Sequence, residues 1–148
     1  EEEENKHFLL QWLRSSTGEV KGYTNHYWNG VTCLFLAQVL RRAIALGVEW
    51  DGVRQLCSSG AVSKFELLQE IKAAYDLTGV SIAPYAAEEA VDRTLVNSST
   101  WEPDVLAVAR VDLRACIEEQ RTFWSRGDAG GAIPASSFAA EEQVRAIG

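Results

Sequence analysis

Residues 29–47 read NGVTCLFLAQVLRRAIALG, and they carry the strongest structural signal in this 148-residue chain. Asn29 is a suitable N-cap and Gly47 is typical of the left-handed residue after a helix, so the sequence predicts a helix over 29–46. Its apolar surface is wider than one stripe and comprises Val31, Leu34, Phe35, Val39 and the turn 40–43. Such a helix is typical of the centre of a helical bundle.

The segment before this helix adds a second helix and a loop. Four apolar residues at helical spacing predict a helix over 4–16, with Gly18 just past its end. They are Phe8, Leu9, Trp12 and Leu13. Residues 18–28 are rich in Gly, Thr and Asn without periodicity, which predicts a loop. Trp28, directly before Asn29, is interpreted as a hydrophobic staple for the following helix.

Two capping boxes open further helices, because the Ser and the Glu of each box satisfy each other's free backbone N–H. The boxes are Ser63 with Glu66 and Ser99 with Glu102. The helix that opens at Ser63 is expected to end at Gly79. The helix that follows the Ser99 box is expected to run over 104–126 with one apolar face. Shorter helical pieces are expected over 51–56, 83–91 and 137–147. Residues 78–82 alternate like a strand, but one strand cannot make a sheet.

Together these elements predict an all-α fold, a single compact bundle of about five main helices over residues 1–126. Residues 127–131 read GDAGG, and residues 127–148 are expected to form a flexible tail with at most a short helix. The chain length and the hydrophobic share of 47% suit one domain with one core.

Composition and charge exclude several classes of protein. Residues 30–40 are too short an apolar run to cross a bilayer, and four glutamates at positions 1–4 are unlike a signal peptide, so we expect a soluble intracellular protein. The net charge of −7 disfavours nucleic acid as a partner. Residues 5–80 nevertheless hold six acidic and eight basic residues, whereas residues 81–148 hold eleven acidic and six basic. The three cysteines are expected to be reduced thiols.

No set of residues predicts catalysis, a cofactor or a metal. Cys33 and His26 are the nearest thiol and imidazole in sequence, but Cys33 falls within an apolar helix, where a thiol is normally inert. The other cysteines and His7 are too scattered for a zinc site, and adjacent glutamates point about 100° apart on a helix. The sequence contains neither G-x-x-x-x-G-K-[ST] nor G-x-G-x-x-G. We therefore do not expect an enzyme.

Four short motifs resemble landmarks of a calponin-homology domain. They are Leu9-x-x-Trp12-Leu13, NGVTCL at 29–34, YDLTGV at 75–80 and VLAV at 105–108. In order, they resemble the L-x-x-W pattern of the family's first helix, the D-G-x-x-L-x-x-L start of its central helix, a helix end before Gly-Val, and the V-L-A-L pattern of its closing helix. The resemblance covers residues 8–117, with Asn29 in place of the family's Asp.

The resemblance implies a non-enzymatic cytoskeletal or ciliary module in the cytoplasm that binds actin filaments, microtubules or a partner protein. Filament surfaces are acidic, so basic residues of the first half are the candidate contacts. They are Arg14, Lys21, Arg41, Arg42, Arg54, Lys64 and Lys72. The alternative is a helical dimerisation or adaptor domain without filament binding, in which the 104–126 helix, with Phe123 and Trp124, pairs with another chain. Neither reading involves a membrane.

Overall fold

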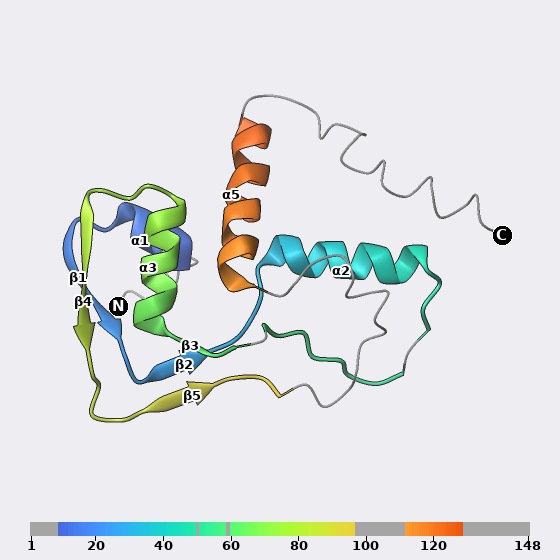
Figure 1. The fold of residues 1–148 in the computed structure, drawn as a ribbon, viewed down its shortest axis with the longest axis horizontal. Coiled ribbons are helices and arrows are strands. Elements are labelled where there is room, and N and C mark those ends of the chain that lie inside the picture. The colour runs from blue at the N-terminus through green and yellow to red at the C-terminus, as the bar shows by residue number, and fades with distance from the viewer. Residues whose placement is uncertain (1–8, 50, 59, 97–111, 129–148) are drawn as a thin grey trace, which may run out of the picture.

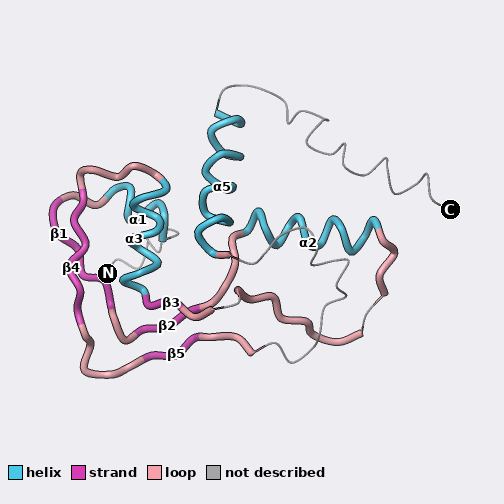
Figure 2. Tube along the Cα trace, in the orientation of Figure 1, coloured by secondary structure: helices cyan, strands magenta, loops and turns pink. Residues whose placement is uncertain are grey.

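The computed structural model describes residues 9–49, 51–58, 60–96 and 112–128, and these form a mixed α/β fold (Figure 1). The elements are α1 (Leu9–Ser15), β1 (Gly18–Tyr23), β2 (His26–Trp28), α2 (Cys33–Ala45), β3 (Val62–Ser63), α3 (Lys64–Ala74), β4 (Val80–Tyr85), β5 (Val91–Arg93) and α5 (Leu113–Asp128). Helices α1 and α3 lie beside β1 and β4, and α5 stands between α3 and α2 (Figure 2). The predicted all-α bundle is therefore wrong.

The strands form two small sheets. β1 and β4 pair in parallel, with Gly18 opposite Val80 and Tyr23 opposite Tyr85. β2 pairs antiparallel with β3 and parallel with β5. Parallel strands need a long crossover connection, so each parallel partner lies far away in the sequence and leaves no local hairpin signal.

Two predicted segments are wrong for this reason. Residues 18–28, predicted as a loop, form β1 and β2, and residues 83–91, predicted as helical, end β4 and reach β5. Gly22 lies within β1, and a Cβ there would come within 2.8 Å of both Ile82 Cγ2 and Phe65 Cδ2. This glycine therefore marks a close approach of strand and helix rather than a turn.

The main hydrophobic core lies among α1, α3, α5 and the inner face of the β1–β4 pair. Leu13 and Leu68 are fully buried at its centre. The other buried members are Leu67, Ile71, Ala74, Val80, Ile82, Leu113 and Ile117. The predicted helix over 4–16 is confirmed over 9–15, and its first residues lie outside the described part of the chain.

The capping box at the start of α3 is confirmed. The Glu66 N–H donates to Ser63 Oγ at 3.2 Å, and the Ser63 N–H donates to Glu66 Oε2 at 2.7 Å. The expected end at Gly79 is wrong, because α3 ends at Ala74 and Asp76, with φ of 52°, takes the left-handed conformation.

The N-cap of α2 differs from the prediction. Thr32 caps the helix, and its hydroxyl accepts a hydrogen bond from the Phe35 N–H at 3.3 Å. The predicted cap, Asn29, instead forms two hydrogen bonds with the backbone of Leu95. Asn29 thus joins the end of β2 to the chain that follows β5, and α2 begins one turn later.

Helix α2 lies at one side of the molecule and not at the centre of a bundle (Figure 1). Gly47 follows it with φ of 62°, as predicted. The short helix expected over 51–56 is absent from this described segment, because Gly52 has φ of 77°, which a right-handed helix cannot include. On one face of α2, Phe35, Val39 and Ala43 pack with Cys116 of α5 in a second, smaller core.

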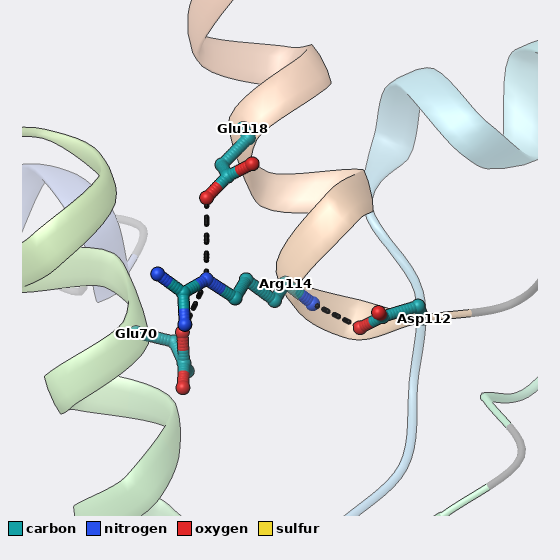
Figure 3. Close-up of polar contacts among 4 residues, drawn as sticks. All are labelled: Glu70, Asp112, Arg114 and Glu118. Carbon is teal, nitrogen blue, oxygen red and sulfur yellow. Dashed lines mark hydrogen bonds and ion pairs between the residues drawn. The ribbon is translucent and has the colours of Figure 1, made fainter.

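Helix α5 confirms the later part of the helix predicted over 104–126, and Arg114 ties it to α3 (Figure 3). Arg114 Nε lies 3.2 Å from Glu118 Oε1 and 3.6 Å from Glu70 Oε2 on α3, and the Arg114 N–H donates to Asp112 Oδ1 at 3.0 Å. These side chains are largely exposed, so each pair contributes little to stability. The second capping box, the start of that helix and the tail beyond 128 lie outside the described residues.

Candidate functional site

A cavity of about 680 Å³ opens among α1, β2, α3 and α5. Its walls are largely apolar and include Leu9 and Leu10 from α1, Leu67 and Ile71 from α3, and Leu113 and Ile117 from α5. Mostly apolar cavities of this size, with a few polar groups, typically bind small organic ligands. The cavity is therefore the candidate site.

Aromatic rings from the turn between β1 and β2 line the cavity. The rings of Tyr23 and His26 stack with their centroids 4.4 Å apart and an angle of 13° between their planes. Tyr27 and Trp28 follow on β2 and line it as well. Tyr85, the β4 partner of Tyr23, meets the Tyr23 ring edge-on at 5.6 Å. Such rings offer flat faces on which a planar group of a ligand can stack.

Basic groups lie beside these rings. Lys64, the first residue of α3, has its Nζ 5.4 Å from the centroid of the Tyr23 ring and 5.9 Å from that of Trp12. Arg93 also lines the cavity, because the parallel register of β2 and β5 places it opposite Trp28. In a chain with a net charge of −7, this local positive charge favours an anionic ligand.

Two buried polar groups also line the cavity. The Tyr75 hydroxyl at the end of α3 and the Gln120 Oε1 on α5 have no hydrogen-bond partner among the described residues. Burial raises the pKa of Tyr75, and a hydrogen-bonding interaction with the Gln120 side chain and then the charges of Arg14 and Arg121 oppose that shift. The hydroxyl therefore stays protonated at neutral pH. The two polar atoms lie near each other, although they do not meet in hydrogen-bond geometry. A ligand that carries hydroxyl groups would satisfy both atoms, whose isolation is otherwise costly.

Cys33 and His26, considered from the sequence as a nucleophile and base, both line this cavity. Cys33 is the first residue of α2 and is exposed, not buried within the helix. No hydrogen bond joins it to His26 in the described structure, so this pair is not arranged as an activated nucleophile. Cys57 and Cys116 are buried free thiols, and burial raises the pKa of Cys116.

The seven basic residues predicted as partner contacts do not form one surface. Lys64 lines the cavity, and Lys21 approaches the same group of rings with its Nζ 4.2 Å from the Tyr85 centroid. The others are spread over α1, α2, the loop after α2 and the far end of α3. The sequence interpretation missed Tyr23, Arg93, Tyr75 and Gln120.

Among the described residues, no three His, Cys, Asp or Glu side chains group together as metal ligands. No helix in that part of the chain is both long enough and apolar enough to span a membrane.

No family model and no curated protein matches this chain. Its fold is similar to that of a dTDP-4-dehydrorhamnose reductase from Clostridium acetobutylicum, with a TM-score of 0.59 and 13% identity over 82% of this chain and 45% of that one. It is also similar to a dTDP-4-dehydrorhamnose reductase from Bacillus anthracis in complex with NADP, with a TM-score of 0.56 and 11% identity over 80% and 44% of the two chains. The chain thus spans less than half the length of these reductases.

The comparisons correct the functional prediction along with the fold. The cytoskeletal or ciliary binding module and its dimerisation alternative both presupposed an all-α bundle, whereas the chain has a mixed α/β fold that occurs within reductases. The expectation that the protein is not an enzyme conflicts with this likeness. At such low identity the likeness establishes the fold only, and the function must be argued from the cavity.

Proposed function

We propose that this chain forms the substrate-binding part of a reductase that acts on a nucleotide-linked sugar. The observation that carries the proposal is the cavity, which combines stacked rings, two basic side chains and two unsatisfied polar atoms. The fold supports it, because both similar structures are enzymes whose names include a dTDP-linked sugar.

The cavity offers one kind of group for each part of such a ligand. The stacked Tyr23 and His26 rings suit a nucleobase, and the cations of Lys64 and Arg93 suit a diphosphate. The Tyr75 hydroxyl and the Gln120 amide oxygen suit sugar hydroxyls, which can donate to both. The volume of about 680 Å³ falls within the range of cavities that bind small organic ligands.

We assign binding of the substrate to this chain, and not binding of the hydride donor. A dinucleotide site of the doubly wound type needs a wide parallel sheet and a G-x-G-x-x-G turn. The sequence lacks that motif, and the described sheets have two and three strands. A nicotinamide cofactor such as the NADP of the Bacillus structure would then be held by another part of the enzyme.

Isothermal titration of the 148-residue chain with dTDP-glucose tests the proposal. We expect saturable binding that Lys64→Ala weakens about tenfold, the loss of one charge-assisted contact. Lys72→Ala is the matched control, because Lys72 lies on the same helix but does not line the cavity. Absence of binding by a chain with a native circular dichroism spectrum, or equal effects of the two substitutions, would refute the proposal.

A further inference from the structure

Helix α2 carries two apolar stripes, and only one of them is covered in the described structure. Phe35, Val39 and Ala43 are buried in the small core against Cys116. The residues that follow each of them are exposed. They are Leu36 at 41%, Leu40 at 40% and Ile44 at 79%, and together we name them the outer α2 stripe. Successive helical residues point about 100° apart, so this stripe forms a second face beside the buried one.

A helix that is apolar over more than one face normally has other structure on both faces. The outer α2 stripe runs along three successive turns of the helix. Exposed apolar residues that are grouped along one helix face, and not scattered singly, are typical of an interface. The sequence analysis linked the wide apolar surface of α2 to a central position in a bundle. The described contacts cover only one face of this helix, so they do not account for the second apolar face.

The fold comparison indicates what covers this face. The chain matches 45% and 44% of the two reductases, so more than half of each has no counterpart here, and one of them binds NADP. We infer that the outer α2 stripe is the surface on which a nucleotide-binding α/β domain of the same polypeptide packs. The inference rests on the proposed function, because it takes the cavity as the substrate site of a reductase.

The position of α2 relative to the cavity supports this assignment. Thr32 and Cys33, at the N-terminal end of α2, line the cavity, and Leu36 lies one turn further along the same helix. A domain packed on the stripe would therefore lie beside the cavity. A reductase needs its hydride donor next to its substrate, and this arrangement supplies that proximity.

Hydroxyl-radical footprinting read by mass spectrometry tests the inference, applied to the 148-residue chain and to the longest natural reading frame that contains it. We expect oxidation of Leu36, Leu40 and Ile44 to fall severalfold in the longer protein. Tyr85, which is 38% exposed and lies on β4 on the opposite side of the molecule, is the internal control and should keep its rate (Figure 1). Equal rates at the stripe in both proteins, or a reading frame no longer than this chain, would overturn the inference.

A variant separates this interface from a general loss of stability. Leu36→Gln/Leu40→Gln/Ile44→Gln should lower the Tm of the longer protein but leave that of the 148-residue chain nearly unchanged. Phe123→Gln/Trp124→Gln, which alters exposed apolar residues of α5, is the control and should not show this split. If the 148-residue chain dimerises and the triple variant is monomeric by light scattering, the stripe binds a second copy and the inference is wrong.

Discussion

The side-chain amide of Asn29 forms two hydrogen bonds with the backbone of Leu95: its Nδ2 donates to the carbonyl oxygen at 2.9 Å, and its Oδ1 accepts from the N–H at 2.7 Å. Asn25 makes the same pair of bonds with Ala87, at 2.8 and 3.0 Å. The two asparagines flank β2 and hold it to the segments on either side of β5. They therefore help to fix the strand that carries the aromatic residues of the cavity.

Asn29→Ala should destabilise the fold by about 2–4 kcal/mol. It removes two hydrogen bonds and leaves the backbone N–H and carbonyl of Leu95 without this partner. Urea unfolding followed by circular dichroism measures the change. Asn29→Asp places a carboxylate oxygen against the Leu95 carbonyl oxygen at a buried position, so it should destabilise the fold at least as much. Wild-type stability of Asn29→Ala would mean that β2 is held in place by other contacts.

Gly30→Ala should destabilise the fold by about 1–3 kcal/mol, the usual effect of forcing extra volume into packed surroundings. A Cβ at Gly30 would collide with the ring of Trp28, which packs against the main core and lines the cavity. Tryptophan fluorescence should change as well. Gly79→Ala is the control, because its Cβ would meet nothing within 4 Å and its φ is not positive. Equal effects of the two substitutions would contradict this packing.

Tyr75→Phe should weaken binding of dTDP-glucose by about threefold to tenfold, the worth of one hydrogen bond. The substitution removes only the hydroxyl, which has no partner among the described residues, so the stability of the free chain should stay level or rise. Titration calorimetry and urea unfolding measure the two quantities. Unchanged binding together with reduced stability would assign Tyr75 a structural role only.

The Ser63–Glu66 capping box should make stability depend on pH. The Ser63 backbone N–H and then its hydroxyl hold the pKa of Glu66 below its ordinary value of 4.5. Because the pKa is lower in the folded state, the contribution is present above pH 4.5 and is lost as the pH falls through the folded-state value. Glu66→Gln should flatten the fall in unfolding free energy below pH 4.5 relative to the wild type. Parallel pH profiles for the two proteins would contradict the coupling.

The helices were predictable where their signals are local. The Ser63–Glu66 box and the left-handed Gly47 both depend on residues within one turn of a helix end, and both are confirmed. The strands were not, because each parallel partner lies across a long crossover. Asn29 illustrates the difference. Asparagine is a favourable N-cap residue, but here its side chain forms hydrogen bonds with the backbone of Leu95, which is distant in sequence.

The candidate site was predictable only in part. Lys64 was among the expected contacts, chosen for its charge alone, and it does line the cavity. Tyr75 lies at the end of α3 and Gln120 lies on α5, and no motif marks either as a binding residue, so only the packing of α5 against α3 brings them to one cavity. One local signal was overlooked, the alternating run GEVKGY at 18–23, which is typical of a strand and ends at Tyr23.

The most direct measurement is a titration of the 15N-labelled chain with dTDP-glucose, followed through its backbone amide signals. We predict saturable shifts at Tyr23, His26, Lys64 and Gln120, around one cavity, and none at Leu40 and Ile44 of α2. Saturable shifts confined to other surfaces, or no shifts in a folded chain, would contradict this prediction.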